Sequence, residues 1–317
     1  MQSLEWYWNR LSLMSPGEIA WRARQAIDGR IRRYLPEAKI PRARVGAVDI
    51  SPWHAPEIAR ADKEAYLAAA DRVLAGEVDL FGEWVSLAKA KDPWNTDPVS
   101  GIVAPPTPGD LLDYRDANLV GSARNVWEVN RHFQLVTLAQ AWSLTRAPKY
   151  REGALKLVRT WLRAAPYPIG LNWVSALEHG IRLINWYIAA RLLRDDASVP
   201  SADPMLLNSI YRHCEYITRH RSRHSSANNH LIGEMVGLYI ASVAWPCWER
   251  SEAWRREAKQ ILEREAQLQV HADGTTREQT VGYQMFVLQF LIIAGLVGES
   301  AGDAFSTAYW DRVRQIN

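Results

Sequence analysis

From about residue 120 onward, the sequence consists of segments in which apolar residues recur every three or four positions. This spacing is typical of helices that bury one face. Breakers such as Pro148, the stretch 166–170 and Pro246 separate the segments and leave short connections between them. Helices are expected over residues 124–145, 150–163, 175–193, 204–219, 229–243, 251–270 and 279–297, with a last one beginning near residue 304.

Paired helices with short connections build helical toroids or solenoids. The sequence has no repeat of fixed period, which disfavours a simple repeat array. No strand-rich region is evident, and the best strand candidates are short extended pieces around residues 78–87. We therefore predict an all-α fold.

The first 120 residues are less regular. Ser15, Pro16 and Glu18 form a helix start, with Ser at the cap, Pro at the first helical position and Glu three residues after the cap. This helix is expected to run to about residue 34, and a second one to cover residues 55–75. We interpret residues 1–120 as an irregular N-terminal arm with the first helices.

Composition excludes some classes of partner. The chain has 38 Lys and Arg against 35 Asp and Glu, a net charge of +3 without a concentrated basic stripe, so we expect no nucleic-acid partner. Most basic residues are Arg, which pairs bidentately with carboxylate or sulfate groups, although solvated helix faces account for most of them. The 15 Trp and 12 Tyr offer flat apolar rings with a polar handle, suited to sugars, but most should be core residues.

Metal and disulfide chemistry has little support. Two isolated cysteines, Cys214 and Cys247, provide neither a disulfide framework nor a zinc site. His220, His224 and His230 lie close together in sequence, but the H-E-x-x-H pattern is missing. We expect no metal and no cofactor.

Five motifs, taken in order and with their spacing, carry a resemblance to a known family. They are Trp127-Glu-Val-Asn-Arg-His132; Gly170-Leu-Asn-Trp173 with Ser175-Ala-Leu-Glu178 and Arg182; Asn228-Asn-His-Leu-Ile-Gly-Glu234; Asp273-Gly274; and Glu278-Gln279 with Tyr283. Together they resemble the heparinase II/III family of polysaccharide lyases. The opening segments, Trp6-Tyr-Trp-Asn-Arg10 and Leu13-Met-Ser-Pro-Gly-Glu18, resemble bacterial members associated with exopolysaccharide.

The resemblance implies an N-terminal helical toroid followed by a C-terminal β-sandwich. We therefore expect residues 121–317 to form the catalytic portion, an incomplete (α/α) toroid of antiparallel helical hairpins, with the sandwich absent from this chain. The implied reaction is β-elimination at a uronic acid, so the expected partner is an acidic polysaccharide. A glycoside hydrolase on a helical toroid and a non-catalytic carbohydrate-binding scaffold are the alternatives. Glu128, Glu178, Glu234 and Glu278 keep the hydrolase open.

The resemblance also implies the roles of individual residues. Asn229 matches the Asn that neutralises the substrate carboxylate, and Tyr283 matches the catalytic Tyr, with His230 beside Asn229. Each has a structural alternative. Asn228 or Asn229 could cap the following helix, and Tyr283 could be a core residue.

Further residues are expected to bind substrate: Arg131, His132, Trp173, Glu178, Arg182, Glu234, Glu278 and Gln279. His230 with Glu234, and Glu178 with Arg182, are spaced one helical turn apart. The alternative for both pairs is a purely structural contact, such as a salt bridge on a helix surface.

The sequence begins without a charged segment followed by an apolar one, so no secretory signal is visible. The longest apolar run, residues 285–297, is too short to span a membrane. We therefore expect no membrane span and a cytoplasmic location, with the periplasm, where lyases of the family often act, as the alternative. The oligomeric state is left open.

Overall fold

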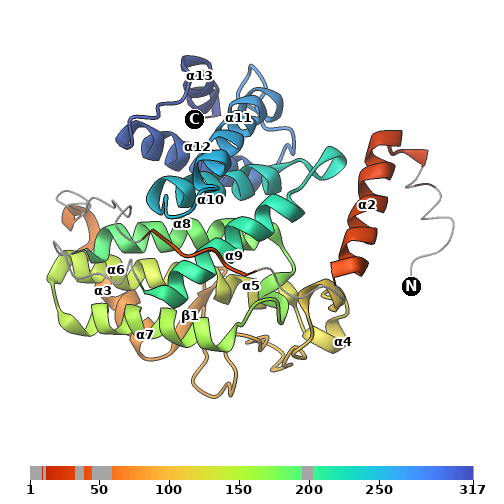
Figure 1. The fold of residues 1–317 in the computed structure, drawn as a ribbon. Coiled ribbons are helices and arrows are strands. Elements are labelled where there is room, and N and C mark those ends of the chain that lie inside the picture. The colour runs from red at the N-terminus through yellow and green to blue at the C-terminus, as the bar shows by residue number, and fades with distance from the viewer. Residues whose placement is uncertain (1–8, 10–11, 33–38, 45–58, 195–202, 317) are drawn as a thin grey trace.

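The computed structural model describes residue 9 and residues 12–32, 39–44, 59–194 and 203–316. Helices dominate the fold (Figure 1). The elements are α2 (Pro16–Arg32), α3 (Ala59–Leu74), β1 (Glu77–Leu80), β2 (Glu83–Ser86), η2 (Gly109–Leu111), α4 (Ala117–Val120), α5 (Ala123–Asn130), α6 (Phe133–Thr145), α7 (Pro148–Ala164), η3 (Leu171–Trp173), α8 (Ala176–Leu193), α9 (Pro204–His220), η4 (His224–Ser226), α10 (Asn229–Ala244), α11 (Ser251–Gln269), α12 (Val281–Ser300) and α13 (Thr307–Ile316).

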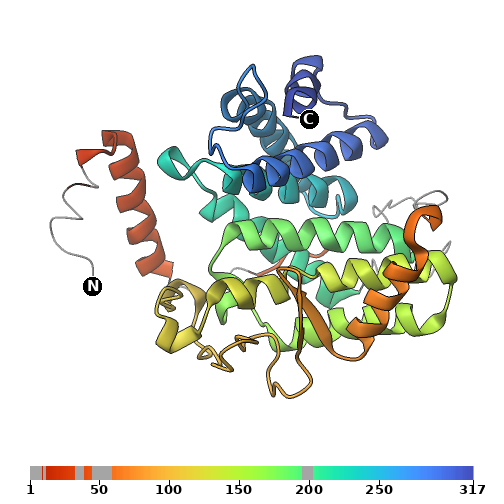
Figure 2. The same ribbon diagram turned by 180° about the vertical axis from the view of Figure 1, so that it is seen from behind.

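The helices form an arc with an inner and an outer layer. In the inner layer α6 packs against α8, α8 against α10, and α10 against α12. Outer helices α7, α9, α11 and α13 alternate with them along the chain and return it to the starting end. This arrangement is an incomplete (α/α) toroid of helical hairpins, as the sequence predicts (Figures 1 and 2).

The distribution of apolar residues around each helix explains whether the helix lies in the inner or the outer layer. Helices α8 and α10 carry apolar or small residues around most of their circumference, and most of their side chains are buried. The outer helix α11 is rich in Arg and Glu and buries a single stripe that includes Trp254, Ile261 and Leu262. The inner helices therefore form the core, and the outer helices shield it.

Helices α8 and α10 approach each other very closely. A side chain on Gly180 would clash with the backbone of Gly233, and one on Gly237 would clash with the backbone of Gly180. The missing Cβ atoms thus bring the first turns of these two inner helices together.

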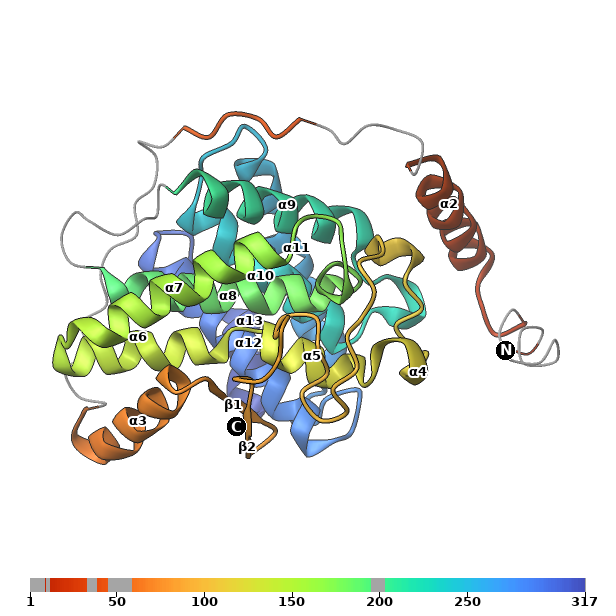
Figure 3. The same cartoon turned by 90° about the horizontal axis from the view of Figure 1, so that it is seen from below.

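The elements outside the toroid differ in how they join it. Strands β1 and β2 form an antiparallel hairpin, in the region where short extended pieces are expected. Helix α2 stands to one side of the helical body in all three ribbon views (Figures 1, 2 and 3). It contacts the last turn of α9 and the loop that follows: Gln25 donates to the Arg219 carbonyl (3.1 Å), and Glu18 accepts a hydrogen bond from Ser225 Oγ (2.5 Å).

Two helix predictions need correction. The continuous helix expected over residues 124–145 is broken between α5 and α6, where His132 adopts a left-handed conformation (φ 68°). Contacts from α8 hold the break: Asn185 Nδ2 donates to the Arg131 carbonyl (2.8 Å), and Trp186 Nε1 donates to His132 Nδ1 (2.7 Å). The helix expected from residue 279 begins at Val281, because Gln279 also has a positive φ of 50°.

The structure also changes the expectation that the longest apolar segment is too short to span a membrane. Within the described residues, α12 alone is long and apolar enough, by length and composition, to cross a membrane. The helix extends beyond the apolar run at residues 285–297 and covers Val281–Ser300, which is why it reaches that length. Its buried side, which includes Val287, Leu291 and Ala294, packs against α10 and α13, as expected of a core helix.

We predict that Gly180→Ala lowers the free energy of unfolding by about 1–3 kcal/mol, because the added methyl group forces α8 and α10 apart. Urea denaturation measures the effect. Gly282→Ala is the matched control, since a Cβ at Gly282 meets nothing within 4 Å and Ala is the better helix former. Equal stability of the two variants would show that the close approach of the helices is unimportant.

Candidate active site

A cleft of about 840 Å³ lies at one end of the toroid. The first turns of α8, α10 and α12 line it, together with α5, the loop after α9 and the tip of the β-hairpin. Helix N-termini present unpaired N–H groups and the positive end of the helix dipole. Arg124, Arg131, His220 and His230 add basic groups to the wall, and Glu178 and Glu234 add carboxyl groups, of which Glu178 pairs with Arg131. The cleft is thus suited to an anionic ligand.

The structure brings together at this cleft the predicted residues Arg131, Glu178, Asn229, His230, Glu234 and Tyr283. They come from α8, α10, α12 and the break between α5 and α6, which are far apart in sequence. The cleft is thus assembled by the toroid and not by any single segment.

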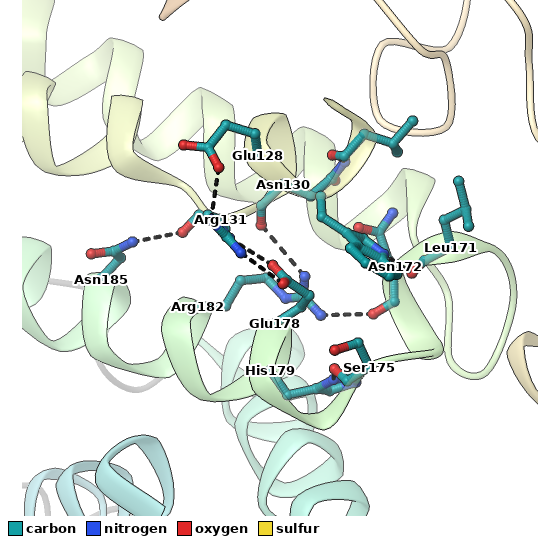
Figure 4. Close-up of polar contacts among 12 residues, drawn as sticks. Glu128, Asn130, Arg131, Leu171, Asn172, Ser175, Glu178, His179, Arg182 and Asn185 are labelled. Carbon is teal, nitrogen blue, oxygen red and sulfur yellow. Dashed lines mark hydrogen bonds and ion pairs between the residues drawn. The ribbon is translucent and has the colours of Figure 1, made fainter. Parts of the chain in front are cut away.

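Arg131 and Glu178 form a bidentate ion pair across the cleft floor (Figure 4). Arg131 Nε and Nη2 donate to the two Glu178 oxygens at 2.8 and 2.9 Å, and Nη1 donates to Glu128 at 2.8 Å. Burial alone would lower the pKa of Arg131, but its hydrogen bonds to Glu178 raise it above the ordinary value. Desolvation raises the pKa of Glu128 despite its contact with Arg131. The guanidinium is therefore a fixed cation whose orientation is set by carboxylates.

The cap of α10 is Asn228, whose Oδ1 accepts a hydrogen bond from the His230 amide (3.0 Å). Asn229 is the first residue of the helix, and its side chain instead donates from Nδ2 to both Glu278 oxygens (2.8 and 2.6 Å). Its backbone N–H also donates to Glu278 (3.1 Å). The capping alternative therefore applies to Asn228 and not to Asn229.

Tyr283 lies at the start of α12 with 48% of its surface exposed, so it is not a core residue. His230 is also exposed to the cleft. Desolvation lowers the pKa of His230, while the nearby carboxylates of Glu178 and Glu278 oppose the shift. The neutral imidazole, which can accept a proton, is thus favoured.

Glu234 is almost completely buried beneath the cleft wall. It accepts hydrogen bonds from the backbone N–H and the hydroxyl of Ser222 (2.7 and 2.8 Å) and thereby holds the loop after α9. Burial raises the pKa of Glu234 to about 7, although the Ser222 hydrogen bonds act in the opposite direction. In place of the expected pairing with His230, Glu234 supports the loop.

His132, Trp173 and Arg182 are at most 2% exposed, and the structure does not bring them to the cleft surface. They form a polar and aromatic layer beneath it. The Trp173 indole donates to the Ala165 carbonyl (3.1 Å), and the Arg182 guanidinium lies over the Trp161 ring at 5.2 Å. Glu178 pairs with Arg131, so the expected surface salt bridge to Arg182 is also replaced. A direct contact of these three residues with a sugar would need the cleft floor to open.

Histidines in this layer are held neutral. Burial, reinforced by the Arg182 charge, lowers the pKa values of His132, His179 and His213 well below the usual range. Hydrogen bonding between His213 Nδ1 and the Ser209 carbonyl (2.7 Å) leaves Nε2 as the acceptor for Arg182 Nε (3.0 Å). The layer therefore carries a single positive charge surrounded by neutral acceptors.

The remaining predicted residues lie beside the cleft. Glu278 reaches it through Asn229, whereas Gln279 is exposed in the turn before α12 and does not line the cavity. Among the described residues, no group of three or more His, Cys, Asp and Glu side chains is arranged to hold a metal ion.

Sequence reasoning missed several residues of the cleft wall: Phe81, Tyr114, Arg124, Trp127 and Ser222. Trp127 stands in one of the motifs, and its indole donates to the Leu171 carbonyl (3.0 Å) beside the Tyr114 ring (5.5 Å). Residue type was the available signal, because exposed aromatic rings suit sugars. Phe81 and Tyr114 had no motif to single them out.

We predict that the raised pKa of Glu234 makes the protein less stable as the pH rises from about 4.5 to about 7. The folded state favours the protonated carboxyl, so this contribution is complete below the ordinary pKa of 4.5 and is lost by pH 8. The expected loss is about 3 kcal/mol. Glu234→Gln keeps an acceptor for Ser222 but cannot titrate. The difference between the unfolding free energies at pH 4.5 and pH 8 should therefore be smaller in the variant than in the wild type. Parallel pH profiles of the two proteins would contradict the assignment.

Comparison with known proteins agrees with this geometry. The family model described as Heparinase II/III N-terminus matches residues 93–316. Among solved structures, the chain is similar to the heparan sulfate lyase HepC from Pedobacter heparinus, with a TM-score of 0.62, 19% identity, and coverage of 84% of this chain and 40% of that one.

It is also similar to the heparinase III BT4657 gene product, with a TM-score of 0.57, 17% identity, and coverage of 92% of this chain and 44% of the other. A further heparinase III structure gives a TM-score of 0.56 at 17% identity, covering 92% of this chain and 42% of the other. The chain thus spans less than half of each of these relatives. No curated protein sequence matches. Since the family model covers most of the chain, the protein belongs to the heparinase II/III family and corresponds to its N-terminal helical portion.

Proposed function

We propose that this chain is the toroid part of a lyase that cleaves a uronic-acid-containing polysaccharide by β-elimination. The observation that carries the proposal is the placement of the Asn229 amide and Tyr283 on one cleft at the positive ends of inner helices. The names of the similar structures, a heparan sulfate lyase and heparinase III, also support a lyase function.

The reaction needs three groups: a donor to the substrate carboxylate, a base and an acid. The proton on C5 of a uronic acid is weakly acidic, and its removal sends negative charge into the neighbouring carboxylate. A donor that is already in position stabilises that charge without reorganisation. A base must take the C5 proton, the bond from C4 to O4 breaks as the C4–C5 double bond forms, and an acid must protonate the departing O4.

Asn229 is the proposed donor. An amide nitrogen carries two diverging N–H groups, and the two oxygens of a single carboxylate lie on the same side of it. Glu278 binds Asn229 Nδ2 from one side, and in this proposal the second N–H donates to the substrate carboxylate once substrate binding uncovers Asn229, which is 2% exposed in the free protein. The same contact turns the amide oxygen away from Glu278, which fixes which end of the amide is the donor.

Tyr283 and His230 are the proposed proton carriers. Both are exposed to the cleft on the first turns of neighbouring helices. A Tyr hydroxyl can protonate the leaving oxygen, and neutral His230 can accept a proton. Arg131, held by Glu178, supplies a fixed cation for the acidic polymer.

A glycoside hydrolase is the second candidate, because Glu234 has a pKa near 7, as a general acid requires. Glu178, Glu234 and Glu278 are, however, already hydrogen-bonded to Arg131, Ser222 and Asn229. Incubation of the full-length protein with a panel of uronic-acid polymers separates the candidates. A lyase produces ultraviolet absorbance from the 4,5-unsaturated ring, a hydrolase produces reducing ends without it, and a scaffold binds without either signal.

We predict that Asn229→Ala and Tyr283→Phe in the full-length protein each lower kcat about a hundredfold or more, because each removes a group that acts in the transition state. Both should fold normally, since Tyr283 is exposed and the helix cap is Asn228. Asn228→Ala is the control. It should lose about 1 kcal/mol of stability and keep its turnover. Near-normal turnover in the two test variants would remove the catalytic assignment.

Glu278 gives a second prediction. Glu278→Gln keeps an oxygen acceptor for Asn229 Nδ2 and should retain kcat within several-fold. Glu278→Ala frees the amide to rotate and should lower kcat about tenfold to a hundredfold, with a smaller change in KM. Steady-state absorbance assays on both variants test the difference. Equal loss in Gln and Ala variants would argue against an orienting role.

A further inference from the structure

Helix α2 contacts the loop after α9, residues 221–228, which leads into α10. The loop extends toward α2 in the ribbon views (Figures 1 and 2). It also connects two parts of the cleft, because Ser222 lines the cavity and Asn229, the first residue of α10, follows the loop directly. The conformation of the loop therefore determines where this side of the cleft wall lies.

The contact uses the polar side of α2. Glu18 is only 4% exposed, and its Oε1 accepts hydrogen bonds from Ser225 Oγ (2.5 Å) and from Arg22 Nη2 (2.7 Å). On the same helix the apolar residues Ile19 and Ile27 are 39% and 54% exposed. A surface helix usually buries its apolar side against the protein. Helix α2 is thus joined to the loop chiefly by polar contacts and not by apolar burial.

The side chain of Glu18 is turned toward the loop. Ser15 caps α2, since its hydroxyl accepts a hydrogen bond from the Glu18 amide (3.2 Å). In a capping box, the carboxylate at this position reaches back to the N–H of the cap residue. Here the carboxylate bonds to Ser225, and this bond, followed by the contact with Arg22, holds the pKa of Glu18 below its ordinary value. Ser225 therefore donates to a charged acceptor, which makes a stronger hydrogen bond than a neutral one.

A second carboxyl group holds the same loop from the side of the toroid. Glu234, which is 1% exposed, accepts from the backbone N–H and the hydroxyl of Ser222 (2.7 and 2.8 Å). The loop is thus attached at Ser222 to α10 and at Ser225 to α2. Between them, His224 has a positive φ of 54°, a costly conformation that persists where the surroundings enforce it. The Trp21 ring of α2 lies 5.7 Å from the His224 ring, so α2 contributes to those surroundings.

We propose that Glu18 is a positioning residue for the cleft: its bond to Ser225 fixes the loop after α9, so that Ser222 keeps its place in the cleft wall. Helix α2 then acts as an external brace of the loop and contributes little to the stability of the toroid itself. The relevance of this brace to catalysis rests on the proposed function, whereas its effect on the loop does not. The family model matches from residue 93 onward, so α2 lies outside the matched range.

Hydrogen–deuterium exchange of the full-length protein, measured by mass spectrometry, tests the effect on the loop. The amides of residues 226–228 are hydrogen-bonded within the loop and report its opening. Glu18→Ala and Ser225→Ala each remove one partner of the bond. Glu18→Gln keeps an oxygen acceptor for Ser225 and is the rescuing variant. Ile27→Ala, which truncates an exposed residue of the same helix, is the control.

We expect the amides of residues 226–228 to exchange about tenfold faster in Glu18→Ala and in Ser225→Ala, because each variant loses a hydrogen bond to a charged group. The double variant should exchange no faster than either single variant, since both changes remove the same bond. Exchange in Glu18→Gln and Ile27→Ala should stay close to that of the wild type. Peptides from α8 and α11 should exchange at the same rate in all the proteins.

Unchanged exchange of the loop in both Ala variants overturns the proposal. An equal rise in α8 and α11 overturns it as well, because it would indicate a general loss of stability. With a uronic-acid polymer as substrate, Glu18→Ala should lower kcat/KM several-fold, chiefly through KM, as fewer molecules have a formed cleft wall, and Glu18→Gln should restore it.

An unchanged kcat/KM in an active Glu18→Ala enzyme whose loop exchanges faster would refute the positioning role. A wild-type protein without lyase activity would instead refute the proposed reaction, and the exchange rates would still decide whether α2 braces the loop.

Discussion

The buried guanidinium of Arg182 connects three segments that are far apart in sequence. It donates to His213 of α9 (3.0 Å) and to the Asn172 carbonyl of η3 (2.7 Å), and it lies within 3.5 Å of the Asn130 carbonyl at the end of α5. A buried charge is costly unless it is fully hydrogen-bonded. The segments around Arg182 are therefore constrained to keep these acceptors in place.

The constraint extends to the cleft through Asn130. Its amide donates to the Trp94 and Val126 carbonyls, and its oxygen accepts from the Trp161 indole (2.8 Å). Arg131 follows immediately in the sequence, and its side chain pairs with Glu178 at the cleft floor (Figure 4). The end of α5 thus contacts two cations. Arg182 is buried and organises the core, and Arg131 is partly exposed and faces the cleft.

Periodicity was sufficient to predict most helices of the toroid, because apolar spacing reports directly on burial. The motif spacing also placed Asn229 and Tyr283 on one cleft. The apolar pattern failed to predict a helix boundary where contacts from a residue distant in sequence determine it. Trp186 and Asn185 stabilise the break at His132 from another helix, and no local signal in residues 124–145 records that contact.

The buried polar layer was missed for a related reason. Arg182 and His132 were assigned to a sugar site by the family resemblance, and polar side chains of this size usually lie at the surface. Their burial depends on acceptors supplied by η3, α9 and α8 once the toroid has formed. The choice between Asn228 and Asn229 as the cap depended likewise on Glu278, which is remote in sequence.

The β-hairpin has a consequence for how such a protein can diversify. Its tip is a two-residue turn, and Phe81 contributes a ring there without belonging to the packed core of the toroid. Exchange of that single residue alters part of the cleft wall, while the inner helices and their polar groups stay unchanged. The rim of the cleft and the packed helices beneath it are therefore formed by separate parts of the chain, and selection can adjust one without disturbing the other.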